Sequence, residues 1–148
     1  MFARLSVRPA RVSDLPAILA IETASFGADA YDRKLFAEYL RKCGGLFLVA
    51  LWGTKVAGYA ISRIHPRGAE LVSIAVLPRH RKRGVASALM DSTLRRLRRR
   101  QIPKITLMVK VSNEAALSFY EKYGFGKLRR VSRYYEDGSD GFLFVRVL

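Results

Sequence analysis

The sequence is poor in cysteine, in long apolar segments and in acidic residues. Its 148 residues include one cysteine, Cys43, which excludes an internal disulfide and fits a reducing compartment. The longest apolar run, Leu46 to Trp52, is too short for a transmembrane helix, so we expect no membrane partner. No hydrophobic segment follows Met1 to Arg4, so we expect no secretory signal and a cytoplasmic protein.

The shortage of acidic residues leaves a strongly basic chain. Its 27 Lys and Arg residues outnumber 12 Asp and Glu residues, which gives a formal net charge of +15. Residues 79 to 104 hold ten basic residues and one acidic residue, Asp91. This balance indicates an anionic partner: nucleic acid, a phosphorylated small molecule, a ribosome or an acidic surface.

Two nucleotide-binding motifs and a metal-binding pattern are missing as well. The Walker spacing G-x-x-x-x-G-K-[ST] and the dinucleotide spacing G-x-G-x-x-G do not occur. His65 and His80 have no partners at metal-ligand spacing. We therefore expect no metal site, and both histidines at the surface.

Hydrophobic periodicity predicts one α/β domain over residues 1–148, in the order β-α-α-β-β-β-α-β-α-β-β. Ser13 is the expected cap of the first helix, with Pro16 in its first turn, and Asp32 is the expected cap of the second. Helices are expected at residues 13–25, 32–43, 84–100 and 113–123. Strands are expected at residues 5–8, 46–52, 56–64, 70–77, 105–111, 125–135 and 142–148.

The segment RHRKRGVASALM, residues 79–90, places positive charge and a glycine at a predicted helix start. A helix N-terminus offers unpaired N–H groups and a partial positive charge. Gly84 permits a positive φ and lets a ligand approach the backbone. Arg81 to Ser87 are therefore a predicted phosphate cradle, and the anion could be a nucleotide, coenzyme A or a nucleic-acid backbone.

Two motifs resemble those of the GNAT family of N-acetyltransferases. Arg81-x-x-Gly84-x-Ala86 is similar to that family's pyrophosphate signature, [Q/R]-x-x-G-x-[G/A]. Residues 113–125, NEAALSFYEKYGF, are similar to its N-x-x-A-x-x-[LF]-Y-x-x-x-G-F segment. The resemblance covers essentially the whole chain. It implies a mixed, mostly antiparallel sheet of about seven strands, helices on both faces, and a central parallel strand pair that splays apart.

The resemblance also implies acetyl-CoA as cosubstrate, lying between the strands at residues 70–77 and 105–111. The pantetheine arm would pair with the backbone of Ile74, Ala75 and Val76, which equally fit an ordinary core strand. Asn113 would hydrogen-bond the cofactor arm. The pyrophosphate would bind the N–H groups of six residues: Lys82, Arg83, Gly84, Val85, Ala86 and Ser87.

The chemistry implied is direct attack of an amine on the thioester, helped by an acid and a base. Tyr120 matches the family's acid, although a core aromatic is the simpler interpretation. In the branch that acetylates ribosomal-protein alanine, a glutamate base stands where this chain has Met108, which cannot accept a proton. Glu70 is the substitute candidate, with an exposed strand-end carboxylate as its simpler interpretation, and a water chain is an alternative base.

Two further segments resemble protein N-terminal acetyltransferases. One spans residues 22–32, from Glu22 to Asp32, and the other is RYYEDGSD at residues 133–140. By this resemblance the peptide N-terminus would contact Phe26, Tyr31, Tyr134 and Tyr135. The same aromatics could instead cap the core or belong to a strand before an Asp-Gly turn.

The leading hypothesis is thus transfer of an acetyl group to a protein or peptide α-amine. Acetylation of a small-molecule amine or of a lysine is the second. The third, from another class, is a basic protein that binds RNA or the ribosome on an acyltransferase scaffold.

Overall fold

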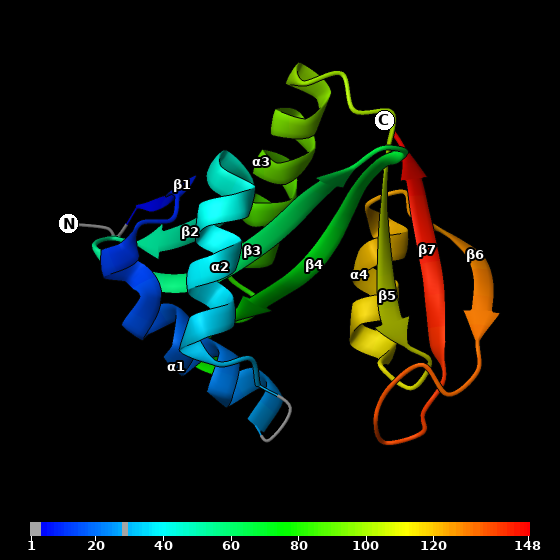
Figure 1. The fold of residues 1–148 in the computed structure, drawn as a ribbon. Coiled ribbons are helices and arrows are strands. Elements are labelled where there is room, and N and C mark those ends of the chain that lie inside the picture. Colours follow the sequence, from blue (N-terminus) through cyan, green and yellow to red (C-terminus); the bar gives the residue numbers. More distant parts are fainter. Residues whose placement is uncertain (1–3, 28–29) are drawn as a thin grey trace.

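The computed structural model describes residues 4–27 and 30–148. In this part of the chain seven strands form one sheet in the order β1-β2-β3-β4-β5-β7-β6, with helices on both faces (Figure 1). No helix in the described residues is long and apolar enough to cross a membrane. The strands are β1 Leu5–Pro9, β2 Phe47–Trp52, β3 Lys55–His65, β4 Gly68–Val76, β5 Lys104–Lys110, β6 Gly126–Val131 and β7 Gly141–Val147. The helices are α1 Leu15–Phe26, α2 Arg33–Cys43, α3 Val85–Arg99 and α4 Glu114–Lys122.

The expected mixed sheet is confirmed, and two hydrophobic clusters fill its two faces. Alternate residues of each central strand point to opposite faces. Leu48 in β2 and Ala60 in β3 join α3 and α4 in one cluster, while Phe47 and Tyr59 join α1 and α2 in the other. Cys43 is free and lies in the second cluster.

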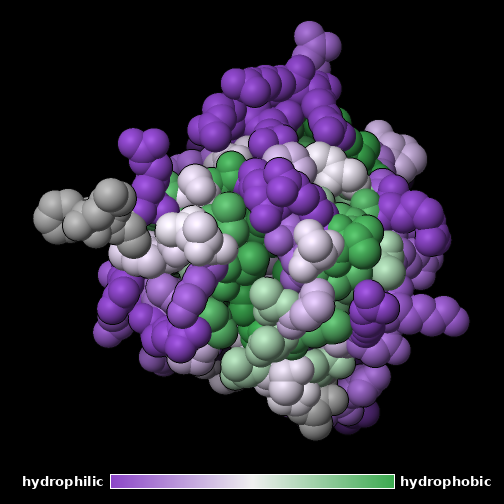
Figure 2. Space-filling view, turned by 90° about the vertical axis from the view of Figure 1, so that its left-hand side faces the viewer, coloured by the Kyte–Doolittle hydropathy of each residue, from purple (hydrophilic) through white to green (hydrophobic). Residues whose placement is uncertain are grey.

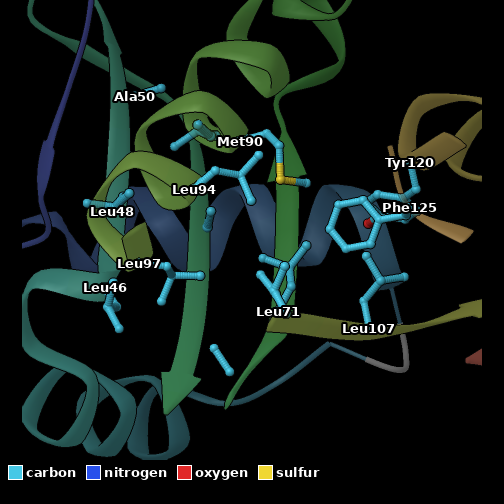
Figure 3. Packing of buried hydrophobic residues seen from close by; sticks show 14 of the residues in the cluster. Leu46, Leu48, Ala50, Leu71, Met90, Leu94, Leu97, Leu107, Tyr120 and Phe125 are labelled. Atoms are coloured by element: carbon cyan, nitrogen blue, oxygen red, sulfur yellow. The ribbon is translucent and has the colours of Figure 1, made fainter. Parts of the chain in front are cut away.

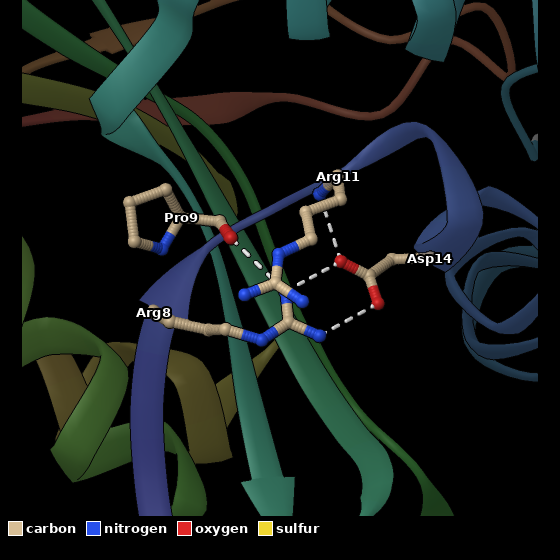
Figure 4. Close-up of polar contacts among 4 residues, drawn as sticks. All are labelled: Arg8, Pro9, Arg11 and Asp14. Atoms are coloured by element: carbon tan, nitrogen blue, oxygen red, sulfur yellow. Dashed lines mark hydrogen bonds and ion pairs between the residues drawn. The ribbon is translucent and has the colours of Figure 1, made fainter.

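One of the two expected helix caps, Asp32, is confirmed, and the other, Ser13, is not. Asp32 caps α2 as expected, because its Oδ1 accepts the Leu35 N–H at 2.9 Å. Ser13 is wrong as the cap of α1: a short 3-10 turn, Val12–Asp14, precedes the helix. The Asp14 carboxylate caps the start of that turn by accepting the Arg11 N–H at 2.8 Å, and Arg8 donates to the same carboxylate at 2.7 and 3.0 Å (Figure 4).

The parallel pair splays as expected. Strands β4 and β5 pair only at Ala69 with Ile105 and at Glu70 with Thr106. Beyond Glu70 they diverge toward the lower end of the molecule in Figure 1. On its other edge β4 stays paired with β3 through to Val76. The sheet therefore opens along most of β4, while β4 stays paired with β3 and β5 with β7.

The last hairpin differs from its prediction, which ran the first strand to Tyr135. Strand β6 ends at Val131, and residues 132–140 form a loop. Asp140 explains the early end, because its carboxylate accepts the Arg133 N–H at 2.9 Å and the Arg130 Nε at 2.7 Å. These bonds replace ladder hydrogen bonds and release Tyr134 and Tyr135 from the sheet.

Candidate active site

The predicted cradle has an anion-binding backbone geometry. Both Lys82 (φ 62°) and Gly84 (φ 81°) are left-handed, and α3 begins at Val85. The first helical bond described runs from the Ala88 N–H to the Gly84 carbonyl at 2.9 Å. The N–H groups of Val85, Ala86 and Ser87 precede that bond and have no helical acceptor. Successive backbone amides turned this way form a concavity that favours anions.

A cavity of about 190 Å³ lies at this helix start. Nothing stands within 4 Å of the position that a Cβ on Gly84 would take, so the approach is open. A negatively charged diphosphate therefore fits the residues present. Val76 and Lys82 line the cavity together with Gly84 to Ser87, whereas the Arg83 guanidinium lies over the Trp52 ring at 5.6 Å.

His80 also lines this cavity, and its expected surface position is wrong. It is 7% exposed, and its ring centroid lies 5.8 Å from that of Trp52. Burial, reinforced by the charges of Arg83 and Arg79, lowers the pKa of His80 below its usual value. Within the described residues its Nδ1 has no hydrogen-bond partner. The imidazole is thus a neutral packing group at the cradle wall.

The edge of β4 that faces β5 is available beyond Glu70. Ile74, Ala75 and Val76 pair with β3 on their other edge, and the Arg81 Nε donates to the Val76 carbonyl at 3.3 Å. An extended ligand could add to this free edge as a strand does. Asn113 caps α4, where its Oδ1 accepts the Ala116 N–H at 3.1 Å and its amide nitrogen remains a donor.

Tyr120 lies in the α3 and α4 cluster and is 9% exposed. Its ring packs edge-on against Phe125 at 5.8 Å, and Figure 3 shows the two side by side near Leu107. Burial, and then the proximity of Tyr135, raises the pKa of Tyr120. The phenol therefore stays protonated at neutral pH while it serves as a core aromatic.

Three of the four expected acceptor residues are close enough to affect one another electrostatically. The pKa of Tyr135 is raised to about 12 by burial and by Tyr134 and Tyr31. The pKa of Tyr31 is raised by burial first, and both Tyr134 and Glu70 contribute. Phe26, at the end of α1, is 42% exposed, and no described aromatic contact joins it to them. The intervening residues 28 and 29 of that predicted loop lie outside the described residues.

Glu70 lies at the joined end of β4 and β5, where Arg63 donates a hydrogen bond to its Oε1. One carboxylate oxygen is thereby engaged, and the second has no partner among the described residues. Met108 lies near the loop of residues 132–140: a Cβ built on Gly141 would meet its Cε at 2.8 Å and the Tyr135 ring at 3.3 Å. Met108 thus supports the tyrosine loop by packing.

A buried carboxylate, to which the sequence analysis gave no role, connects the loop after α1 to the central strands. Glu22 is 1% exposed; its Oε2 accepts the Tyr31 N–H at 2.8 Å and its Oε1 accepts the Tyr59 hydroxyl. That hydroxyl lies 3.1 Å from the Ser73 Oγ on β4. The network links the loop after α1 to the strand that splays. The partners of Glu22 are 9 and 37 residues away in the sequence, so local spacing does not reveal the network. The signal in the sequence that includes Glu22 is the resemblance of residues 22–32 to N-terminal acetyltransferases.

Comparison with known proteins agrees with this geometry. A sequence model of the Acetyltransferase (GNAT) family matches residues 15–125. An N-alpha-acetyltransferase of Saccharolobus solfataricus is 32% identical over 97% of this chain and 93% of its own. The [ribosomal protein bS18]-alanine N-acetyltransferase of Escherichia coli K12 is 32% identical over 87% and 85%. The solved structure of Ard1 from Thermoplasma volcanium superposes with a TM-score of 0.93 at 28% identity, covering 97% of both chains.

The match extends over most of the chain and over the residues that form the cradle. The cavity at Gly84, the splayed strands and the buried Tyr120 belong to the same matched region. An acetyl-CoA-dependent acyltransferase activity follows from the family. The chain belongs to the Acetyltransferase (GNAT) family.

Proposed function

We propose that this enzyme transfers the acetyl group of acetyl-CoA to the N-terminal α-amine of a protein or peptide. One observation carries the proposal: β4 and β5 separate beyond Glu70, an amide cradle follows β4, and Tyr31, which is close enough to Glu70 and Tyr134 to feel their charges, lies near the start of the separation. Relatives named as N-alpha-acetyltransferases support the same acceptor class.

Each end of the gap is suited to one substrate. The N–H groups of Val85 to Ser87, together with the nearby basic side chains, bind the diphosphate. The free edge at Ile74 to Val76 aligns the pantetheine arm, and the Asn113 amide nitrogen can donate to it. Tyr31, Tyr134 and Tyr135 supply hydroxyl groups and ring faces to the peptide's first residues.

The reaction needs two proton movements. The amine nitrogen attacks the thioester carbon, the tetrahedral intermediate collapses, and the C–S bond breaks. Tyr120 donates its phenolic proton to the departing thiolate sulfur. Glu70, through its unpartnered oxygen, or water accepts the proton that the nitrogen loses. A backbone N–H of β4 near Ile74 stabilises the negative charge that develops on the thioester oxygen.

An α-amine suits a site in which Glu70, the carboxylate proposed as the base, is already held by an arginine. With a pKa near 8, about a tenth of an α-amine is neutral at pH 7, compared with well under 0.1% of a lysine amine. A weak base or water therefore suffices for the first substrate and not for the second. This difference favours the α-amine over lysine as the acceptor.

The proposal extends to partner and location. A relative is named for acetylating a ribosomal protein, and this chain carries a net charge of +15, which supports association with RNA or the ribosome. A cytoplasmic location is supported by the free Cys43, as is usual in a reducing compartment.

The test is a thiol-release assay with acetyl-CoA and matched acceptors. One peptide is offered with a free N-terminus and no lysine, a second with a blocked N-terminus and one lysine, and a polyamine serves as the small amine. We expect release with the first peptide to exceed that with the other acceptors by at least about tenfold. Preference for the blocked lysine peptide or for the polyamine would contradict the α-amine assignment.

A further inference from the structure

A second concavity runs along α3 from Asp91 to Arg99, and its four arginines lie toward the end of the helix that is far from Gly84. Its volume is about 710 Å³, and it is lined by Arg95, Arg98 and Arg99 from α3, and by Arg146 from β7. Tyr123, at the end of α4, forms part of its wall, and we call this concavity the arginine groove. Because α3 has 15 residues, its last turn lies about 20 Å from Gly84.

The positive charge of the groove is not compensated within the described residues. Asp91 is the only acidic residue in its lining. The described ion pairs involve Arg8, Lys42, Arg63, Lys110 and Arg130, and none includes a residue between 79 and 104. The crowding of positive charge affects the neighbouring Arg96. Its pKa is lowered first by burial and then by the charges of Arg95, Arg99 and Arg100.

The helix dipole accounts for only part of this arrangement. Basic residues are favoured in the last turn of a helix, which explains Arg98 and Arg99. Arg146, from β7, donates to the Tyr123 carbonyl at 2.6 Å at the C-terminus of α4. Each helix end thus accounts for its own arginines, but not for their meeting at one groove. Convergence of guanidinium groups from a helix and a strand on one concavity is typical of a polyanion site.

The size and shape of the groove favour a chain of phosphates over a single anion. Arg95 and Arg99 are one turn apart, about 6 Å along α3, close to the spacing of successive phosphates in a nucleic-acid strand. The Tyr123 ring and the guanidinium planes can stack on bases that are not paired. Figure 2 shows hydrophilic side chains gathered at the top of the molecule, where α3 ends.

We propose that the arginine groove binds the phosphodiester backbone of single-stranded RNA while the acetyl-CoA site remains accessible. This rests on the proposed function, because a protein α-amine and RNA occur together wherever proteins are made or assembled on RNA. The groove would hold the enzyme on the RNA and leave the gap between β4 and β5 free for the peptide.

The test measures binding of a fluorescent single-stranded RNA 20-mer by anisotropy in several salt concentrations. The groove variant R95Q/R98Q/R99Q is compared with R33Q/K34Q/R41Q, which removes the same charge from exposed positions on α2. We expect the groove variant to bind about tenfold more weakly. The slope of log association constant against log salt concentration should become less negative by about 2. The α2 variant should change affinity less than about twofold.

Acetylation of a free short peptide is measured in parallel and should be unchanged in the groove variant. Equal losses in both variants, or displacement of RNA by acetyl-CoA, would overturn the groove assignment. Failure of the wild type to acetylate the peptide would instead refute the acceptor assignment, and the RNA affinities would be unaffected by that result.

Discussion

At the residue scale, the surroundings of Tyr120 fix the protonation of its phenol. The side chain is 9% exposed among apolar neighbours, and its raised pKa keeps the acid form present as the pH rises. The proton is therefore present for a departing thiolate, although a phenol with a raised pKa is a weaker acid, so its transfer must be concerted with departure. The same burial makes the ring part of the core, so the packing and chemical interpretations are compatible.

Replacing Tyr120 by phenylalanine should therefore lower kcat by about 100-fold, because the thiolate would leave without a proton donor. The ring remains, so the affinity for acetyl-CoA and the melting temperature should change little. Steady-state kinetics measure kcat, titration calorimetry measures the acetyl-CoA affinity, and thermal unfolding measures the melting temperature. A kcat within about twofold of the wild type would exclude Tyr120 as the acid.

Asp14 is the residue whose charge most clearly supports the fold. The hydrogen bond from Arg8, with help from the Arg11 N–H, holds its pKa below the usual value. The native state therefore binds the Asp14 proton less tightly than the unfolded chain does. The resulting stability is complete above pH 5 and is lost as the pH falls through the native pKa.

Asp14→Asn should accordingly reduce the free energy of unfolding by about 1 to 3 kcal/mol at pH 7, since it leaves Arg8 without its partner. Urea unfolding at pH 7 and at pH 3 checks the sign of this effect. The difference in the free energy of unfolding between variant and wild type should be smaller at the lower pH. Glu38→Gln, which removes an exposed pair with Lys42, is the control and should have the smaller effect. A gap that widens in acid would contradict this role.

Residues with a local signature could be predicted from the sequence, and residues that act across the fold could not. Asp32, Asn113 and Gly84 have short-range partners, and their positions are as expected. The bonds of Glu22 to Tyr59 and of Arg63 to Glu70 join separate elements, and periodicity carries no information about such pairs.

At the element scale, the packing of α3 on the sheet positions the amide cradle at the start of that helix. Gly58 lets the helix approach the sheet, because a Cβ there would lie 2.8 Å from the Ala75 carbonyl and 3.0 Å from the Val85 side chain. This close contact seats the first turn of α3 directly beside β4. The predicted helix and strand bounds were correct to within a few residues here, because glycine and proline mark both ends.

Gly84→Ala and Gly84→Glu test the cradle together. Both force a side chain into a left-handed conformation, which should cost about 1 kcal/mol of stability. We expect alanine to weaken acetyl-CoA binding about tenfold and glutamate to abolish it, since its charge repels the diphosphate. Isothermal calorimetry measures both affinities.

Gly53→Ala is the matched control, because Gly53 also has a positive φ and open space around its Cβ position, in the β2–β3 turn. It should lose similar stability and keep its acetyl-CoA affinity. Unchanged affinity in Gly84→Glu would remove the cradle from the binding site.

The last hairpin is the element that periodicity predicted least well. The alternation of residues 125–135 resembles a strand, yet Asp140 captures the Arg133 N–H and ends β6 four residues early. Side-chain hydrogen bonds to backbone compete with the sheet ladder in this way. Tyr134 and Tyr135 owe their position outside the sheet to that competition.

At the scale of the whole molecule, the two hydrophobic clusters stabilise the sheet on both sides of the gap between β4 and β5, an open seam in the sheet. One cluster joins α3 and α4 across the seam, from β2 to β7, while the other covers β2 to β4 under α1 and α2. The seam can therefore stay open without separating the two halves of the sheet. The alternation of elements predicted a mixed sheet covered on both faces, whereas the central parallel pair was expected only from the family resemblance.

The most direct measurement is a crystal structure of the enzyme with a conjugate of coenzyme A and a peptide N-terminus. We expect the diphosphate on the amides between Lys82 and Ser87, the pantetheine arm along Ile74 to Val76, and the peptide between Tyr31 and Tyr134. A diphosphate bound elsewhere, or a peptide that enters from the side of the cradle, would contradict the account.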